Sequence, residues 1–282
     1  MTYTLAIGDR AYSSWSLRGW LLFDAFGIPV KVVTARLYSD DLARVLADFA
    51  PARTVPALAV DGAVVTDSLA IAEELASREG GIWPSDPPLR AIARSLAAEM
   101  HSGFSALRSH CAMNLRVAYA DCAPGAEVLA DLARIDAIWT HAMARSGGPW
   151  LCGEYSAADV FFAPVAARIA GHSLPTAHPE YVAAHLAHPS FRRWRAMGMV
   201  DGADQAAYAR DWPQKDWPMP VKPATACEGP AVNDACPYSG KPVTDFLEFD
   251  GRVYGFCNPF CRDKTMADPE AWPAFMRIVN LS

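Results

Sequence analysis

The chain has 282 residues, of which 52% are hydrophobic and 20% are charged, and its formal net charge is −6. This length and hydrophobic share are enough for two domains with buried cores. A net negative charge gives no general attraction for nucleic acid. The sequence has no apolar run long enough to span a membrane, and residues 1–4 lack the features of a secretion signal. We therefore expect a cytoplasmic protein with neither nucleic acid nor a membrane as a partner.

Residues 1–80 predict the element order β-α-β-α-β-β-α. The expected elements are a strand at 3–7, a helix at 17–26, a strand at 30–37, a short helix at 40–49, strands at 57–60 and 63–66, and a helix that follows residue 68. Asp61 and Gly62 form the hairpin turn, and Asp67 with Ser68 caps the last helix. This order is typical of a thioredoxin-like fold. The redox members carry Cys-x-x-Cys at the first strand-to-helix turn, and residues 13–16 here read Ser-Ser-Trp-Ser, so dithiol chemistry is not expected.

The next part of the chain, residues 88–212, predicts an all-helical domain. A linker rich in Gly and Pro occupies residues 80–88, and a helix at 89–107 has apolar side chains four residues apart. Further helical stretches fall near 125–146, 156–171 and 179–197. Ser156 and Asp159 have the spacing of a capping box, which we interpret as part of the folding apparatus.

The start of the first helix is a candidate site for activating a thiol. Backbone N–H groups are unpaired at a helix start and the helix dipole is positive there, so an anion is stabilised. A hydroxyl from Ser13 or Ser14 adds a charge-assisted hydrogen bond to a thiolate. A serine before a helix is also the ordinary N-cap, so both readings stay open.

Three separated motifs resemble the cytosolic glutathione S-transferases over residues 1–215. They are Tyr12-Ser13-Ser14-Trp15-Ser16-Leu17-Arg18, Thr54-Val55-Pro56-Ala57-Leu58 and Asp67-Ser68-Leu69-Ala70-Ile71. The resemblance implies glutathione as co-substrate. It implies that Ser13, or else Ser14, holds the thiolate, that Val55 pairs through its backbone with glutathione before a cis-Pro56, and that Asp67 and Ser68 bind the γ-glutamyl end. It also implies a homodimer.

The same resemblance implies a pocket for a small hydrophobic electrophile, lined in part by the helical domain. Its candidate wall residues are Trp15, Met100, His101 and Phe104, although core packing explains such side chains equally well. Conjugation, peroxide reduction and isomerisation of a double bond all use the same thiolate. The Ser-Ser-x-Ser run is similar to the zeta-like members, which include maleylacetoacetate isomerases, but Trp15 replaces their usual Cys.

The tail, residues 227–282, follows a Pro-rich segment at 213–226 that is either a linker or a strap held across the body by its tryptophans. Four of the seven cysteines lie in this tail. A knuckle-like turn at Cys236, a hairpin at 246–256 and a helix that opens at Cys257-x-x-x-Cys261 predict a small treble-clef-like metal site.

The tail resembles the small YHS and TRASH-type cysteine domains, whose three main cysteines match Cys236, Cys257 and Cys261. The resemblance implies a bound zinc or another thiophilic metal, with Cys227 as a candidate fourth ligand. A fold that has lost its metal and free buried cysteines are the alternatives. The leading functional hypothesis is a glutathione transferase, and the other is a non-catalytic, dimeric scaffold whose tail binds or senses metal.

Overall fold

The computed structural model describes residues 2–281. The sheet domain and helical domain comprise β1 (Thr4–Ile7), α1 (Ser14–Asp24), β2 (Lys31–Thr34), α2 (Asp40–Leu46), η1 (Ala47–Phe49), β3 (Ala57–Val60), β4 (Ala63–Thr66), α3 (Ser68–Glu79), α4 (Pro87–Ser102), α5 (Ser105–His110), β5 (Ala118–Tyr119), α6 (Ala126–Ser146), α7 (Ala157–Gly171), α8 (Pro179–Ala187) and α9 (Pro189–Val200). The rest of the chain holds η2 (Ala206–Tyr208), β6 (Gln214–Lys215), β7 (Thr225–Cys227), β8 (Asp245–Phe249), β9 (Arg252–Phe256), α10 (Pro259–Ala267), η3 (Pro269–Ala271) and α11 (Pro273–Leu281).

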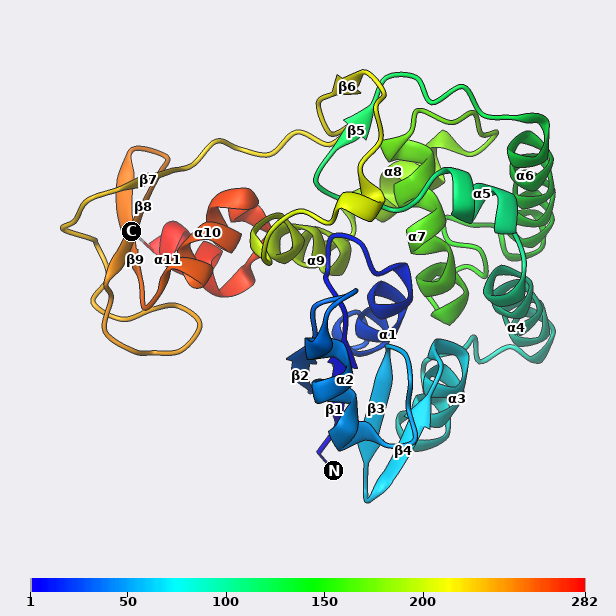
Figure 1. Ribbon diagram of the computed structural model, residues 1–282, viewed down its shortest axis with the longest axis horizontal. Helices are drawn as coiled ribbons and strands as arrows, with labels where there is room; N and C mark the ends of the chain where they lie inside the picture. The colour runs from blue at the N-terminus through cyan, green and yellow to red at the C-terminus, as the bar shows by residue number, and fades with distance from the viewer. Residues whose placement is uncertain (1, 282) are drawn as a thin grey trace.

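The N-terminal domain is a four-stranded sheet in the order β2-β1-β3-β4, with β1 and β2 parallel and the other pairs antiparallel. Helices α1 and α3 pack together beside the sheet, and the α2–η1 segment contributes a smaller cluster around Phe49 (Figure 1). The thioredoxin-like prediction for this domain is therefore confirmed. The hairpin of β3 and β4 has the predicted residues at both strands.

Helix α1 begins three residues earlier than the predicted residue 17. Ser13 is its N-cap, because the Ser13 side chain accepts a hydrogen bond from the backbone N–H of Ser16. The helix passes very close to the β3 side of the sheet at Gly19, where an added Cβ atom would lie 2.8 Å from the side chain of Pro56. Only glycine permits this approach, which holds the start of α1 against the segment before β3.

The helical domain packs α4, α6, α7 and α8 around the largest core of the protein. Two predicted helices are each divided. The one expected at 89–107 ends at Ser102 and resumes at Ser105, because Phe104 has a positive φ of 58°. The one expected at 179–197 is interrupted before Pro189, since proline disfavours the helical conformation of the residue that precedes it.

The buried side chain of Asp159 forms the predicted capping box at the start of α7. Its carboxylate accepts hydrogen bonds from the backbone N–H groups of Leu151 and Ser156 and from the hydroxyl of Tyr181. Burial raises the pKa of Asp159 to about 6, although these hydrogen bonds oppose the shift. The box is therefore structural. Across residues 2–281, no helix combines the length and apolarity that a membrane crossing requires.

The segment after α9 crosses the helical domain before the chain reaches the tail (Figure 1). Trp212 and Trp217 pack against the main core, and β6 pairs antiparallel with β5. The sequence left open whether this region is a linker or a strap. Residues 212–217 form a strap, and an extended connection follows toward β7.

The tail forms a three-stranded antiparallel sheet, β7-β8-β9, covered by α10 and α11, with its own core of aromatic side chains. It lies beside α9 and away from α4 and α6 (Figure 1). Arg192 on α9 donates two hydrogen bonds, of 2.8 and 2.6 Å, to the buried carboxylate of Asp268. Arg193 joins Asp24 of α1 to the carbonyl of Ala271 in the tail. Helix α9 therefore connects the tail to the sheet domain.

Replacing Arg192 with Gln is expected to loosen the tail, since a bidentate and partly buried ion pair contributes about 1 to 2 kcal/mol. Limited proteolysis within residues 218–235 should accelerate about tenfold, because cleavage follows the population of the open form. Arg134→Gln is the matched control, since its pair with Glu99 joins α4 and α6 far from the tail. Equal cleavage of both variants contradicts the prediction.

Candidate functional site

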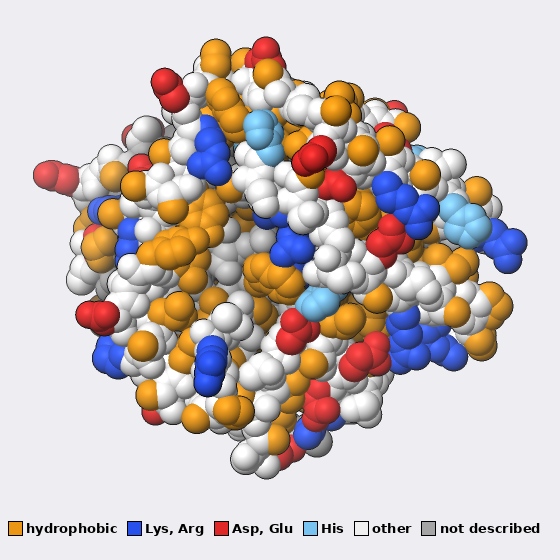
Figure 2. Space-filling view, turned by 45° about the vertical axis from the view of Figure 1, so that its right-hand side comes forward, with side chains coloured by type: hydrophobic (Ala, Val, Ile, Leu, Met, Phe, Trp, Pro, Cys, Tyr) orange, Lys and Arg blue, Asp and Glu red, His pale blue; other side chains and the backbone are white. Residues whose placement is uncertain are grey.

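A pocket of about 860 Å³ opens between the sheet domain and the helical domain, and we call it the interdomain pocket. Its wall combines residues 12–15, 37–42 and 54–56 with Asp67, the segment 105–113, Arg168 on α7 and residues 207–208. Figure 2 shows one face of the molecule that is hollowed between hydrophobic side chains, with basic side chains beside them. Segments widely separated in sequence therefore build one concave site.

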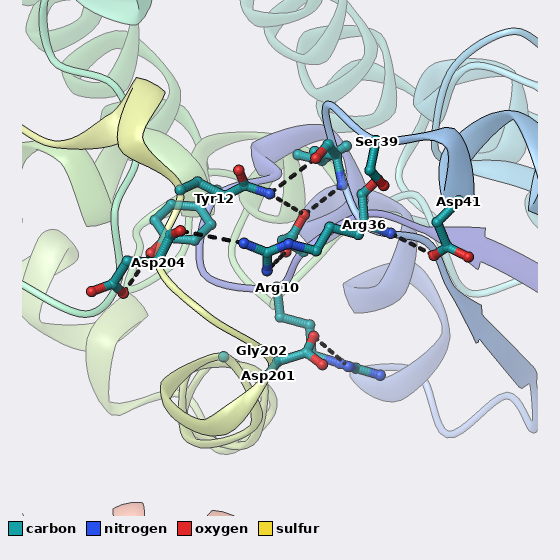
Figure 3. A network of polar contacts seen from close by, with 12 residues as sticks. Arg10, Tyr12, Arg36, Ser39, Asp41, Asp201, Gly202 and Asp204 are labelled. Atoms are coloured by element: carbon teal, nitrogen blue, oxygen red, sulfur yellow. Dashed lines mark hydrogen bonds and ion pairs between the residues drawn. The ribbon is translucent and has the colours of Figure 1, made fainter.

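The loop between β1 and α1 is clamped before it enters the pocket (Figure 3). The buried carboxylate of Asp9 accepts hydrogen bonds from Arg36 Nη1, at 2.9 Å, and from the backbone N–H of Leu37, at 2.7 Å. Arg10 pairs with Asp201 at 2.8 Å, just after α9. The backbone carbonyl of Asp9 accepts from the N–H of Ser13. These contacts fix where α1 starts, and nothing local in the sequence indicated them.

The two candidate serines have different partners. The Ser13 hydroxyl is buried, donates to Ser16 Oγ at 2.8 Å and accepts from the Ser16 N–H at 3.2 Å, so it is committed to the helix cap. The Ser14 hydroxyl is half-buried at the pocket wall and accepts from Arg168 Nη2 at 3.3 Å. This contact leaves the Ser14 O–H free to donate. Ser14 is therefore the better placed of the two to donate to a sulfur atom in the pocket.

The second motif, residues 54–58, shares the pocket wall with the start of α1. The peptide bond between Val55 and Pro56 is cis, as predicted, and both residues line the wall. No hydrogen bond described outside the helices and strands uses the amide or the carbonyl of Val55. The backbone of Val55 is thus available to a peptide ligand.

The third motif lies at the start of α3. Asp67 lines the pocket, has a φ of 79° and caps α3 by accepting from the N–H of Leu69 at 2.7 Å. Ser68 is fully buried, and its hydroxyl has no protein partner among the described residues. A buried hydroxyl without a partner is rare, so the Ser68 hydroxyl is available to form a hydrogen bond with a ligand.

Asp67 also links the motif to the helical domain. Its Oδ2 lies 3.2 Å from Nε2 of His101, and the His101 ring meets the Trp15 ring edge-on at 5.1 Å. Burial lowers the pKa of His101, although the charge of Asp67 opposes the shift. Trp15 lines the pocket as expected, whereas His101 contacts it through Asp67 and Trp15.

Three arginines converge on the pocket from different elements. Arg108 and Arg168 line its wall, and buried Arg18 lies beneath Trp15 with its guanidinium carbon 4.0 Å from the ring centroid. Burial, and then the positive charge of Arg108, lower the pKa of Arg18 to about 9 and that of Arg168 to about 10. Among the described residues, none of the three forms a salt bridge, and Arg18 Nε and Nη1 have no hydrogen-bond partner. The inner part of the pocket is therefore positively charged.

The structure places Met100 and Phe104 elsewhere than the sequence suggested. Both are core residues, with 2% and 7% of their surface exposed, and neither lines the pocket. The segment after the break at Phe104, which includes Ala112 and Met113, lines the pocket instead. Tyr208, whose ring lies 4.9 Å from that of Tyr12, covers the pocket from the segment after α9. Sequence reasoning missed these residues because they carry no motif.

The comparisons with known proteins agree with this geometry. A family model described as "Glutathione S-transferase, N-terminal domain" matches residues 12–78, which hold all three motifs. A protein from Caenorhabditis elegans named "Probable maleylacetoacetate isomerase" is 33% identical over 102 residues, which are 36% of this chain. Residues 12–78 therefore resemble the N-terminal domain of the glutathione S-transferases. The aligned part spans about half, 47%, of that curated relative.

Solved glutathione S-transferases share the fold at low sequence identity. A Burkholderia homologue, solved with bound glutathione, is 22% identical with a TM-score of 0.54, covering 70% of this chain and 98% of its own. A diazinon-metabolizing transferase from Bombyx mori is 14% identical with a TM-score of 0.56, covering 71% of this chain and 98% of its own. These neighbours confirm the predicted sheet domain followed by a helical domain.

The tail holds a separate cluster of three cysteines. The Sγ atoms of Cys236, Cys257 and Cys261 all lie within 4.8 Å of one another. Burial alone would raise the pKa of Cys236, but backbone N–H groups, including those of Tyr238 and Cys257, lower it to about 7. Cys227 is outside this group, because β7 pairs with β8 and sets Cys227 opposite Phe246. The prediction of Cys227 as a fourth ligand is therefore wrong for this arrangement.

Proposed function

We propose that the chain is a glutathione transferase that holds the glutathione thiolate at the start of α1 and presents it to an electrophile in the interdomain pocket. The observation that carries this proposal is the meeting of the Ser14 hydroxyl, the free backbone of Val55 and the start of α3 around one cavity. Val55 is suited to pair with the cysteinyl unit of glutathione. The N-terminus of α3, with Asp67 and Ser68, is suited to its γ-glutamyl end, where a helix terminus favours a carboxylate.

To activate glutathione, the site must stabilise the thiolate relative to the thiol by a modest free energy. Lowering a thiol pKa from about 8.5 to about 6.5 requires roughly 2.7 kcal/mol. One hydrogen bond to a charged atom contributes about 1.5 to 3 kcal/mol, and a helix N-terminus adds about 0.3 to 1 kcal/mol. Ser14 and the start of α1 are together sufficient for this.

The electrophile that best fits the pocket carries a negative charge as well as an apolar part. Arg108 and Arg168 present guanidinium groups without carboxylate partners, which suits a carboxylate. This extends the sequence hypothesis, which specified only a hydrophobic electrophile. Sulfur attack on an electron-poor double bond of such a compound leads either to a stable conjugate or, after rotation and loss of sulfur, to an isomer. The printed name of the C. elegans relative favours isomerisation, and Trp15 is a departure from the zeta-like pattern. A homodimer and a cytoplasmic location belong to the same proposal.

The test compares two electrophiles that share one reactive double bond and differ only in whether a nearby group is a carboxylate or its methyl ester. We expect glutathione-dependent turnover with kcat/KM at least about tenfold higher for the carboxylate, as one charged hydrogen bond allows. Failure of glutathione to bind in calorimetry, together with no turnover of either compound, refutes the enzyme. A preference for the ester refutes only the anionic electrophile.

A second function, metal binding by the tail, is favoured by the spacing of Cys236, Cys257 and Cys261. Thiolates at this separation suit Zn²⁺ or another thiophilic ion, with one position open to a further ligand. Ser239 Oγ and Asn258 Nδ2 lie 3.2 and 3.3 Å from Cys257 Sγ and stabilise a thiolate there. In the scaffold alternative, this metal site is the functional part of the molecule.

Cys257→Ser is expected to remove one equivalent of zinc per chain, as measured by mass spectrometry of the full-length protein after dialysis. Three ligands hold the ion, so the loss of one weakens its binding strongly. Cys227→Ser is the matched control, because Cys227 lies outside the cluster, and its zinc content should equal that of the wild type. An equal zinc content in both variants contradicts the site. Unchanged glutathione turnover in Cys257→Ser makes the tail accessory to the enzyme.

A further inference from the structure

A second cluster of metal-ligating side chains lies in the helical domain, behind the interdomain pocket. His110 is the last residue of α5, Cys111 caps that helix, and Cys122 follows β5. The Sγ atoms and an imidazole nitrogen of this trio all lie within 4.8 Å of one another. Cys111 and Cys122 are 0% and 3% exposed, whereas His110 is exposed. The imidazole of the trio is therefore exposed to solvent, and its two thiols are buried.

The donor set suits a thiophilic ion. Two thiolates and one imidazole are typical ligands of Zn²⁺, at about 2.3 Å for sulfur and about 2.0 Å for nitrogen, and these lengths bring the ligands of one ion within 4.8 Å of one another. Both cysteines are free thiols, and neither lines the interdomain pocket. The proposed glutathione chemistry therefore does not use these two thiols.

Charge balance permits a divalent ion at this buried site, because the two cysteines can bind it as thiolates. A divalent ion with two thiolates is neutral overall, which removes the cost of burying a net charge.

A second imidazole, that of His172, shares a ring neighbour with His110. His172 is 3% exposed, its Nδ1 lies 3.1 Å from the carbonyl of Arg168, and its Nε2 has no hydrogen-bond partner among the described residues. The rings of His110 and His172 both contact Trp212, at 5.5 and 5.8 Å.

The trio also adjoins the pocket wall. The carbonyl of Cys111 accepts a hydrogen bond from Arg168 Nε at 3.0 Å, and the next two residues, Ala112 and Met113, line the pocket. An ion that joins Cys111 to Cys122 fixes the segment that positions Arg168. We propose that His110, Cys111 and Cys122 bind a thiophilic divalent cation such as Zn²⁺ in a structural site that is distinct from the tail cluster.

The test is an anaerobic titration with Co²⁺, a spectroscopic substitute for Zn²⁺, on full-length protein in which Cys257→Ser has disabled the tail cluster. We expect one equivalent of Co²⁺ to bind with thiolate-to-cobalt charge-transfer absorption and the visible bands of tetrahedral cobalt. In the same background, His110→Ala should weaken binding about tenfold or more, since it removes one of three ligands. This residue is exposed, so the variant should fold. His141→Ala, an exposed histidine on α6, should bind Co²⁺ as the parent does.

The proposal is overturned if the Cys257→Ser protein gives no charge-transfer absorption, or if His110→Ala and His141→Ala bind Co²⁺ equally. It is also overturned if mass spectrometry of protein prepared under reducing conditions shows the loss of two hydrogen atoms through a bond between Cys111 and Cys122. These readouts do not depend on glutathione turnover. A failed metal site is therefore distinguishable from a failed enzyme.

Discussion

Replacing Ser14 with alanine is expected to raise the pKa of bound glutathione's thiol by about 1 to 2 units and to lower kcat/KM about 10- to 100-fold at neutral pH. The Ser14 hydroxyl lies at the pocket wall and accepts from Arg168, so its proton is free to donate to the sulfur. Without that donor, the thiolate keeps only the start of α1 as stabilisation. Thiolate absorbance in the ultraviolet, followed against pH for the bound thiol, measures the shift.

Ser13→Ala is the matched control for this experiment. It removes the N-cap of α1 and should lower the free energy of unfolding by about 1 kcal/mol. The pKa of the bound thiol should change little, because the Ser13 hydroxyl is committed to Ser16. If Ser13→Ala raises the thiol pKa and Ser14→Ala does not, the role belongs to Ser13, the residue that the sequence motif ranked first. An unshifted thiol in the wild type refutes activation altogether.

Replacing Arg108 with Gln is expected to lower kcat/KM for the carboxylate electrophile about 10- to 100-fold and to leave the matching methyl ester within about twofold. Arg108 lines the pocket, it has no carboxylate partner within residues 2–281, and its described hydrogen bonds all use Nη1. The loss reflects one charge-assisted hydrogen bond to the anion. Steady-state kinetics with the paired electrophiles measures the ratio directly.

Two further variants keep this result interpretable. Arg108→Lys retains the charge and should recover part of the preference for the carboxylate, which a merely structural role would not predict. Arg94→Gln is the control for a change of net charge, since Arg94 is exposed on α4 and pairs with Glu73. An equal loss for acid and ester in Arg108→Gln contradicts an anion-binding role and indicates a damaged pocket.

Features with a local cause could be predicted from the sequence alone. The turn at Asp61 and Gly62, the tail hairpin of β8 and β9, and the capping box of Ser156 and Asp159 all depend on residues a few positions apart. Short-range backbone preferences and caps act before distant contacts form, so their signals can be read directly. The same holds for the three glutathione motifs, each of which is a contiguous run of residues.

The tertiary structure decided which side chains meet. The sequence motif ranked Ser13 ahead of Ser14, and the contact of Ser14 with Arg168, 154 positions away, now favours Ser14. The convergence of Arg18, Arg108 and Arg168 was equally invisible, because an arginine outside a motif carries no sign that it will be buried. Met100 was expected at the pocket wall and is a core residue, because the face of α4 that carries it packs against the main core.

The sequence by itself thus determined the order of elements, the family resemblance and the residues of each short motif, because these depend on neighbours along the chain. The charge of the pocket, the partner of each serine and the cluster of His110, Cys111 and Cys122 became visible only when α1, α5 and α7 packed together. Those properties depend on burial and on distances between atoms from different elements. Periodicity in a sequence reports which face of a helix is buried, and it does not report what that face will touch.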